Sequence, residues 1–340
     1  MAVTLAQVAS LAGVSQPTAS RVLNGSARTP APHVVEAVRK AADQLGYIAN
    51  AQAQALVRSS SRLLGLVVHD IADSYFSTIA AGVERAAEER QLQVMLAVTG
   101  RDPLRELAAV QTFISHRADA VVMAGSQWSG KAATDVRGRL LDNLERFVDD
   151  KHGAAVIGPR VEGLSAVTPE NRRGAGALAN ALLDAGTRDF IVLSGPPGLV
   201  TGAERTAGFT AALKRRGVTA RRVPGDLSRD GGFEAAQQVF AELPSGDVAP
   251  CLFAVTDVMA IGAAAAARLA GLRIPEDVQI AGFDDIVTLR DFTPGLTTVH
   301  LPLEEMGYRA AMLATEGAGA RSERAPATVV LRESTLNPGS

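Results

Sequence analysis

The sequence of 340 residues predicts an N-terminal all-α helix-turn-helix head followed by an α/β body with two doubly wound parallel-sheet lobes. Three short segments within residues 1–49 carry apolar residues at helical spacing. From Leu63 onward, short apolar strands alternate with amphipathic helices, and the alternation occurs in two successive sets. An uneven distribution of charge separates the head from the body.

The composition is that of a globular protein, with 47% hydrophobic and 21% charged residues. The single cysteine, Cys251, excludes a disulfide framework within the chain and argues against a thiolate metal cluster. No apolar run reaches the roughly 18 residues of a membrane span. The N-terminus lacks the basic and continuous apolar regions of a secretory signal. The sequence therefore predicts a cytoplasmic protein without a membrane partner.

The formal net charge of −2 is an average over two unlike parts. Residues 1–62 contain six basic and two acidic side chains, a charge of +4, and the remaining residues carry −6. Such an asymmetry is typical of a polyanion-binding head on a neutral-to-acidic body. Many small helical segments reach +4 by chance, so the charge alone is weak evidence.

Two short helices open the chain. Thr4 is suited to N-cap a helix over residues 5–13, and Ser15 is suited to cap a second helix over residues 16–24 after a tight turn. The second helix buries an apolar stripe and presents polar or small side chains on another face. Those side chains suit phosphates and base edges.

A third helix, from about His33 to Leu45, is expected to end at Gly46 and to pack Val34 or Val35 inward. Two short helices around a tight turn, followed by a supporting helix, form a helix-turn-helix arrangement. The alternative is an ordinary three-helix cap in which Ser15 serves only as an N-cap.

The stretch VTLAQVASLAGVSQPTASRVLNG resembles the DNA-binding head of the lactose/galactose-repressor (LacI/GalR) family of bacterial transcription regulators. The following LGYIANAQAQALVRSSSRLLGLVV is also similar to that family, and the resemblance continues to the C-terminus. It implies a ligand-responsive regulator, expected to be a repressor, that binds a pseudo-palindromic operator DNA as a homodimer and responds to a small-molecule effector.

The resemblance implies that Gln16 and Pro17 determine sequence specificity and that Arg21 contacts a base edge. The full set of implied DNA-binding positions is Thr4, Leu5, Ser15, Gln16, Pro17, Thr18, Ser20, Arg21, Asn24, Tyr47, Asn50, Ala53 and Leu56. The chain departs from the family where TPAPHVV replaces the usual polar cap and Thr-Arg pair before the third helix. One or two of the phosphate contacts of the family therefore have no matching residue in this chain.

Residues 50–62 are predicted to form a hinge helix and linker between the head, residues 1–49, and the body, residues 63–340. The segment NAQAQALV could form a short helix, but a helix of fewer than about 12 residues is marginal alone in water. A plain linker is the alternative. The resemblance implies that the segment folds when two subunits meet on DNA, with Leu56 inserted in the minor groove beside Ala53.

The body is expected to contain two sets of strands and helices. The first set has the strands LLGLVVHD, QVMLAVTG, DAVVMAG and AAVIGP, and helices near Thr78–Arg90, Leu104–His116 and Gly138–Val148. The second set has the strands DFIVLSG, RRVPGDL, CLFAVTD and VQIAGFDD, and helices near Arg173–Ala185, Glu204–Arg216, Gly232–Leu243 and Met259–Ala270. The predicted lobes cover about 63–160 with 293–321, and about 161–290 with 322–340.

Ligands of such sheets bind beyond the carboxyl ends of the strands. The resemblance implies a periplasmic-binding-protein-like body that binds a small sugar or metabolite effector in the cleft between the lobes. The candidate effector-binding residues are Asp73, Tyr75, Phe76, Ser126, Arg160, Thr201, Leu227, Thr256 and Asp284.

Asp284 would accept hydrogen bonds from effector hydroxyls; the alternative is a loop or helix cap. Arg205 is expected to brace its lobe through an ion pair. Ala203 and Leu227 replace an arginine and an aromatic residue that are common in sugar-binding members. The pocket is thus expected to be less polar than a monosaccharide site.

Enzyme and cofactor sites are not predicted. Gly174–Ala179 matches the dinucleotide pattern G-x-G-x-x-A but falls inside an expected helix. The five histidines lack metal-ligand spacing, and no nucleophile with a base is evident. The second functional hypothesis, a solute-binding protein without DNA function, predicts an export signal and no basic head; the sequence meets neither expectation.

Overall fold

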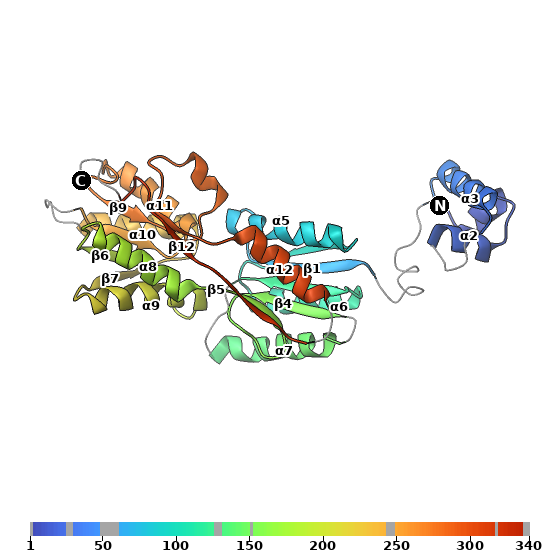
Figure 1. The fold of residues 1–340 in the computed structure, drawn as a ribbon, viewed down its shortest axis with the longest axis horizontal. Coiled ribbons are helices and arrows are strands. Elements are labelled where there is room, and N and C mark those ends of the chain that lie inside the picture. Colours follow the sequence, from blue (N-terminus) through green and yellow to red (C-terminus); the bar gives the residue numbers. More distant parts are fainter. Residues whose placement is uncertain are drawn as a thin grey trace. The chain divides into compact units, whose positions relative to one another are not determined.

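The structure is a computed structural model that describes residues 3–24, 30–47, 61–125, 131–149, 152–242, 249–316 and 319–335. The chain forms two compact units, residues 1–62 and 63–340, and each is considered separately (Figure 1). The division after Arg62 coincides with the predicted start of the body. Among the described residues, no helix is both long enough and apolar enough to span a bilayer.

The head contains α1 (Leu5–Leu11), α2 (Gln16–Asn24) and α3 (Pro32–Leu45). Thr4 forms a capping box with Gln7: the Thr4 N–H donates to Gln7 Oε1 at 2.8 Å, and the Gln7 N–H donates to Thr4 Oγ1 at 3.4 Å. The three helices meet on a small core of valine and alanine, and Val34, rather than Val35, packs against it. The predicted helices of the head are confirmed.

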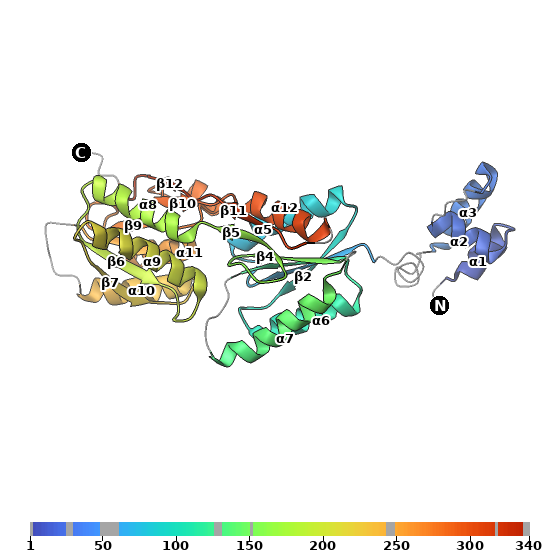
Figure 2. The same ribbon diagram turned by 60° about the horizontal axis from the view of Figure 1, so that its bottom comes forward.

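The first lobe is built on a six-stranded parallel sheet in the order β11-β5-β4-β3-β1-β2. Its strands are β1 (Leu63–Val68), β2 (Gln93–Val98), β3 (Ala120–Ala124), β4 (Gly153–Ile157), β5 (Ser165–Pro169) and β11 (Ser322–Ala325). One face is covered by α5 (Ser74–Glu89) and α12 (Leu303–Thr315), and the other by α6 (Pro103–Ser115) and α7 (Lys131–Phe147) (Figures 1 and 2).

The second lobe has a four-stranded parallel sheet in the order β7-β6-β8-β9. Its strands are β6 (Phe190–Ser194), β7 (Ala220–Pro224), β8 (Cys251–Ala254) and β9 (Gln279–Ala281). Four helices pack in pairs: α8 (Asn171–Asp184) with α9 (Val200–Arg215), and α10 (Arg229–Glu242) with α11 (Asp257–Leu269). The 3-10 helix η1 (Val287–Asp291) precedes a two-stranded antiparallel ladder of β10 (Thr298–His300) and β12 (Thr328–Val330).

All strands and helices expected between residues 63 and 285 are present, but several helices begin earlier than predicted. For α5 the first residue is Ser74 instead of Thr78, because Asp73 caps this end: its Oδ1 accepts the Tyr75 N–H at 2.9 Å. A cap is a local hydrogen bond that apolar periodicity does not mark. The rejected dinucleotide pattern lies inside α8, as expected.

The predicted lobe limits are wrong at two places. Strands β5 and β11 pair within the sheet of the first lobe, although residues 165–169 and 322–325 were assigned to the second. Strand β10, assigned to the first lobe, pairs with β12 instead. The pairing partners are up to about 160 residues apart in sequence, so local patterns cannot reveal where the chain crosses between lobes.

Both sheets contain a topological switch point, where the helices that follow two adjacent strands run to opposite faces. In the first lobe this point lies between β1 and β3, and in the second between β6 and β8. Open α/β sheets bind ligands at the carboxyl ends of such strands. The loops after these four strands therefore mark the region where a site is expected.

Candidate functional site

A cavity between the two lobes lies at these switch points. The first lobe contributes His69, Asp73, Tyr75, Phe76 and Arg101, and the second contributes Thr201, Arg205, Leu227, Thr256 and Asp284. The enclosed volume is about 40 Å³, which has room for a few water molecules. A sugar-sized molecule requires the lobes to move apart from this arrangement.

A buried ion pair forms the second-lobe wall of the cavity. Arg205 on α9 is 1% exposed, and its Nη2 and Nη1 donate to the two Asp284 carboxylate oxygens at 2.6 and 3.1 Å. The remaining contacts of the guanidinium are with Asn171 Oδ1 at 3.0 Å, the Val255 carbonyl at 2.8 Å and the face of the Phe283 ring at 4.0 Å. The expected ion pair of Arg205 is present, and its partner is Asp284 itself.

Two opposing influences act on the Asp284 carboxyl. Burial raises its pKa, and the adjacent Arg205 guanidinium lowers it. Because arginine stays protonated, an ionised Asp284 carboxylate balances the positive charge of the buried Arg205 guanidinium. Nearby, burial raises the pKa of Asp257, the first residue of α11, to about 6. The second lobe thus places fixed charge close to the cleft.

The first-lobe wall is mainly aromatic. The rings of Tyr75 and Phe76 lie edge to face at 5.0 Å, and His69 lies 5.4 Å from Phe76 between ring centroids. The Asp73 carboxyl caps α5, and burial raises its pKa. Burial also raises the pKa of the Tyr75 hydroxyl. Aromatic faces beside hydrogen-bonding groups suit a ligand with both polar and apolar surfaces.

One hydrogen bond crosses the cleft directly: Arg101 Nη2 donates to the Leu227 carbonyl at 2.8 Å. Arg101, His69 and Arg205 were not among the candidate effector-binding residues. Two signals could have found the first two, because His69 ends a predicted strand and Arg101 lies in a loop after another. Arg205 lies one turn after Thr201 on α9, so it faces the same space.

Seven of the nine candidate effector-binding residues line the cavity. Arg160 is exposed on the loop after β4 and is not among the described residues of the lining. Ser126 lies outside the described residues. The structure therefore brings together Asp73, Tyr75, Phe76, Thr201, Leu227, Thr256 and Asp284. Arg160, which is exposed, is not part of this group.

In the head, α2 exposes Gln16, Pro17 and Arg21 to solvent, while Ser20 is half-buried. Ser15 Oγ accepts the Thr18 N–H at 3.3 Å and lies 2.8 Å from Thr18 Oγ1, so the predicted cap is confirmed. Thr4 remains exposed beside its capping box. Its hydroxyl and that of Ser15 therefore have a structural role in addition to any contact with phosphate.

Other candidate DNA-binding residues differ in their placement. Leu5 and Tyr47 pack against the head core and are half-buried. Asn50, Ala53 and Leu56 lie outside the described residues, as does the side chain of Asn24. Helix α3 begins after Ala31, whose methyl group cannot accept an N-cap hydrogen bond, in agreement with the departure noted in TPAPHVV.

A helix-turn-helix unit followed by a two-lobe body with an interlobe cavity defines the class of ligand-responsive DNA-binding regulators. Residues 4–50 match the family described as bacterial regulatory proteins, lacI family, and residues 179–339 match a periplasmic binding protein-like domain. The transcriptional regulator CelR of Thermobifida fusca is 32% identical over 318 residues, which cover 91% of this chain and 90% of that protein.

GalS of Salmonella typhimurium is 32% identical over 321 residues, 93% of this chain and 90% of that protein. Among solved structures, the lac repressor dimer bound to operator and the anti-inducer ONPF has a TM-score of 0.82, with 26% identity and coverage of 99% of this chain and 100% of that one. A CelR–cellobiose complex has a TM-score of 0.67, with 28% identity and coverage of 98% and 99%.

The chain belongs to the LacI family of bacterial regulatory proteins. It is a DNA-binding transcriptional regulator of the helix-turn-helix type, and its named relatives are regulators rather than enzymes.

Proposed function

We propose that this regulator is a repressor that acts in the cytoplasm as a homodimer on a pseudo-palindromic operator, and that a small sugar or metabolite in the interlobe cleft changes its affinity for DNA. The observation that carries the proposal is the exposed polar face of α2 on a positively charged head, in a chain whose body has a cleft lined by both lobes.

In the head, the roles follow from exposure and chemistry. Among the described side chains of α2, Gln16 and Arg21 are exposed and can donate to base edges in a major groove. Arg21 is suited to a bidentate contact with guanine. Pro17 has no side-chain donor, so direct readout at the start of α2 depends on Gln16. We assign phosphate contacts to the hydroxyl groups of Thr4, Ser15 and Thr18.

Dimerisation is supported by the edge strand β2 of the first lobe. Leu96 is 42% exposed and Val98 is 47% exposed on this strand, and Ile71 in a nearby loop is 42% exposed. A monomer seldom leaves large aliphatic side chains on an unpaired edge. A second copy would cover them and would place two heads against two half-sites.

In the cleft, Thr201, Thr256 and Asp73 offer hydrogen bonds, while Phe76 and Leu227 offer apolar contact. An effector would act by binding one separation of the lobes more tightly than another. The hydrogen bond between Arg101 and the Leu227 carbonyl links the lobes in the present arrangement. Opening the cleft would break this contact.

Selection from random double-stranded DNA with the full-length protein tests the DNA function. We expect enrichment of a two-fold symmetric sequence. Gln16→Ala should weaken binding to that sequence about tenfold, because one good base contact gives about 1–3 kcal/mol of discrimination. Gln44→Ala, an exposed glutamine on α3, is the matched control. Recovery of no common sequence would disprove the proposal.

A thermal-shift screen of sugars, sugar phosphates and nucleosides tests the effector site. A ligand at about 100 times its Kd should stabilise the protein by about 2.7 kcal/mol. Thr201→Val keeps the buried ion pair and should reduce the shift. Thr210→Val on the same helix is the control, because the Thr210 hydroxyl bonds to the Thr206 carbonyl. Equal shifts in both variants would argue against the cleft as the binding site.

A further inference from the structure

The second lobe has a groove on its surface, which we call the α9 groove. It lies between the loop of residues 194–198, the first two turns of α9 and the edge strand β7, and its volume is about 240 Å³. Glycine backbone, alanine methyl groups and the rings of Pro196, Pro197 and Pro224 form most of its lining. The groove therefore presents a rigid and largely apolar surface.

Helix α9 separates the groove from the interlobe cleft. Thr201 and Arg205 of this helix line the cleft, whereas Ala203, Thr206 and Ala207 line the groove. With 3.6 residues per turn, the two sets lie on different faces of the helix. The cleft and the groove share no lining residue in the part of the chain that the structure describes, so the groove is a separate space.

One buried hydroxyl in the lining has no hydrogen-bond partner among the described residues. Thr206, in the second turn of α9, is 5% exposed and lines the groove, and its Oγ1 is the atom without a partner. Burial of an unpaired hydroxyl is unfavourable. Threonine on a helix has two accessible χ1 rotamers, so rotation can turn the hydroxyl toward a ligand in the groove. A ligand with a hydrogen-bond acceptor would supply the missing partner.

Arg222 on β7 brings a positive charge to the groove. Its Nη2 donates to Thr210 Oγ1 at 3.4 Å, a long contact with a neutral hydroxyl, and the described lining contains no acidic residue. A guanidinium has five N–H donors, so this contact leaves others for a ligand. Thr210 lies one turn after Thr206 on α9, which brings the Arg222 guanidinium within about one turn of the Thr206 hydroxyl. The two oxygens of one carboxylate can therefore contact both groups.

We infer that the α9 groove binds a small aromatic carboxylate, with its carboxylate on Arg222 and Thr206 and its ring against the prolines. Arg222 and Pro224 are two residues apart on β7 and so lie on the same face of the strand, which places the charged and the apolar contacts side by side. The volume exceeds the roughly 150 Å³ of a cavity that accepts benzene, so a single substituted ring fits. The inference does not depend on the effector proposed for the cleft.

The chemistry of the lining selects the two parts of the ligand. A guanidinium matches a planar carboxylate in a two-point, charge-assisted contact that a neutral alcohol lacks. A flat ring can contact a proline ring or a peptide plane over its whole face, and a rigid ring loses less conformational freedom on binding than an alkyl chain does. The apolar lining cannot satisfy the hydroxyls of a sugar.

The test uses the full-length protein and 4-fluorobenzoate, observed by fluorine NMR. We expect a saturable change of the fluorine signal and its reversal by benzoate. Acetate, which lacks the ring, and benzyl alcohol, which lacks the charge, should each compete about tenfold more weakly than benzoate. Hexanoate, which is flexible, should compete several-fold more weakly. Absence of saturation, or competition by any of these three that equals that of benzoate, would overturn the inference.

Variants locate the site. Arg222→Gln should weaken 4-fluorobenzoate binding about fivefold, whereas Arg221→Gln, at the adjacent exposed arginine that pairs with Glu242, should leave it unchanged. Ala207→Phe should occupy the groove and abolish binding. Thr206→Val keeps the shape of the side chain without the hydroxyl and should weaken binding several-fold.

Thr201→Val distinguishes the groove from the proposed effector site, because it changes the cleft face of the same helix. This variant should bind 4-fluorobenzoate as the wild type does. Equal binding by the two arginine variants, unaltered binding by Ala207→Phe, or loss of binding in Thr201→Val would exclude the groove as the site.

Discussion

The two lobes share a doubly wound plan but differ at their edge strands. On β2, the edge of the first lobe, Leu96 and Val98 are exposed, whereas on β7, the edge of the second lobe, Arg221 and Arg222 are exposed. Charged edges resist pairing with other chains, and apolar edges favour being covered. The common plan determines the fold, while the side chains at the edge determine which lobe can meet another copy.

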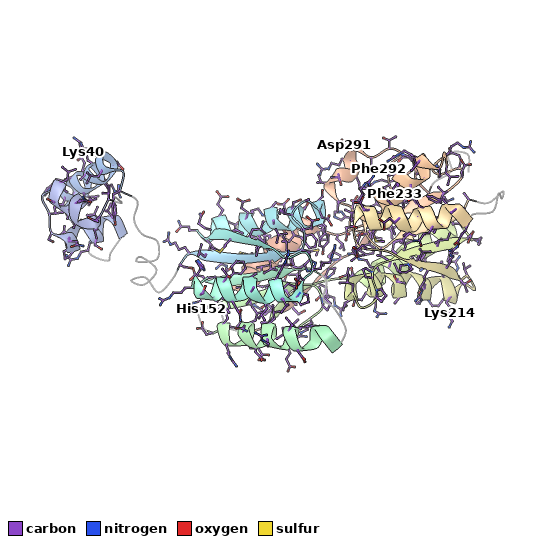
Figure 3. The ribbon with its side chains drawn as sticks, turned by 180° about the vertical axis from the view of Figure 1, so that it is seen from behind. Lys40, His152, Lys214, Phe233, Asp291 and Phe292 are labelled. Atoms are coloured by element: carbon purple, nitrogen blue, oxygen red, sulfur yellow. The ribbon has the colours of Figure 1, made fainter. Side chains whose placement is uncertain are left out.

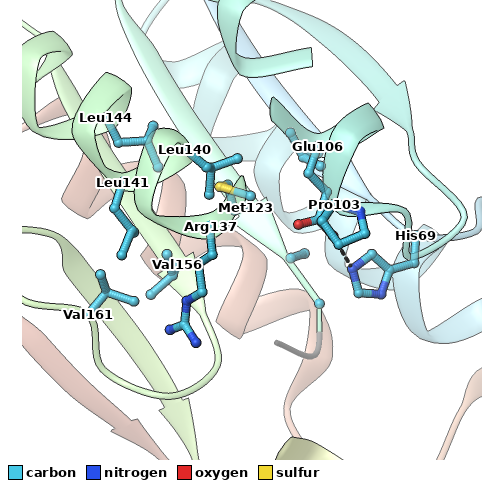
Figure 4. Close-up of a pocket in the computed structure, with 13 residues that line it drawn as sticks. His69, Pro103, Glu106, Met123, Arg137, Leu140, Leu141, Leu144, Val156 and Val161 are labelled. Atoms are coloured by element: carbon cyan, nitrogen blue, oxygen red, sulfur yellow. Dashed lines mark hydrogen bonds and ion pairs between the residues drawn. The ribbon is translucent and has the colours of Figure 1, made fainter. Parts of the chain in front are cut away.

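The lobes also differ inside. The second lobe buries the Arg205–Asp284 pair and stacks Phe209 on Phe253 at 4.3 Å between ring centroids. The first lobe instead has a mainly aliphatic pocket of about 60 Å³ between α6, α7 and the ends of β1, β3 and β4 (Figure 4). Figure 3 shows the side chains of both lobes from behind, with Lys214 and Phe233 labelled on the second lobe and His152 on the first. The second-lobe wall of the cleft is thus formed by a buried ion pair, whereas the first-lobe wall lies next to an aliphatic pocket.

The largest effect is expected from breaking the ion pair of the second lobe. Asp284→Ala leaves the Arg205 guanidinium buried without its carboxylate, and removal of one partner of a buried pair costs about 3–5 kcal/mol. Chemical denaturation should report this loss in the free energy of unfolding. The same variant is therefore a poor test of effector binding, because a destabilised protein would confound the result.

The control lies on the opposite wall of the same cavity. Asp73→Ala removes the cap of α5, which should cost about 1 kcal/mol. If the two substitutions destabilise the protein equally, the prediction that the ion-paired Asp284 contributes more to stability than the capping Asp73 is wrong.

The sequence predicts local elements well because their signals are local. Thr4, Ser15 and Gly46 mark helix ends in the head, and alternating apolar strands mark the body up to residue 285. The Arg205–Asp284 pair was only half predicted: its two members are 79 residues apart, and each was given a separate role. Strands β5 and β11 and helix α12 were not predicted as elements, because their positions depend on which lobe the chain enters when it crosses back.

The mainly aliphatic pocket of the first lobe has no signal in the sequence. Its wall is formed by residues of β1, α6, β3, α7 and β4, which are far apart along the chain. Packing of this kind depends on the volumes of many side chains at once. Neither apolar periodicity nor a sequence motif indicates how completely these side chains fill the space between the elements.

Substitution of the apolar edge tests the comparison of the two edge strands. Leu96→Lys places a charge on β2 in each copy of a dimer. The loss of two buried leucines, at about 1.5–3 kcal/mol each, should raise the dimer dissociation constant about a hundredfold or more. Sedimentation velocity across a dilution series measures the dissociation constant. Arg222→Glu on β7 should leave the dimer intact. If both variants are monomers, the two edge strands do not differ in the proposed way.

A pH-dependent effect is expected from Asp257, a second carboxyl group buried among the described residues of the second lobe. Asp257 accepts hydrogen bonds from the Thr298 hydroxyl at 2.6 Å and the Ile286 N–H at 3.0 Å, yet burial raises its pKa to about 6. In the unfolded chain the group ionises near its ordinary value of 3.8. Between these values the unfolded chain releases its proton first, so the contribution of Asp257 to stability is present at low pH and lost as pH rises.

Asp257→Asn keeps a neutral side chain of the same shape at every pH. Relative to this variant, the wild-type protein should lose about 2 kcal/mol of unfolding free energy between about pH 4 and about pH 7. Denaturation at several pH values measures the difference. Asp277→Asn is the control, because the exposed pair with Arg273 lowers the Asp277 pKa to about 2, which is below this range. A flat difference between wild type and Asp257→Asn would mean that Asp257 stays ionised in the folded lobe.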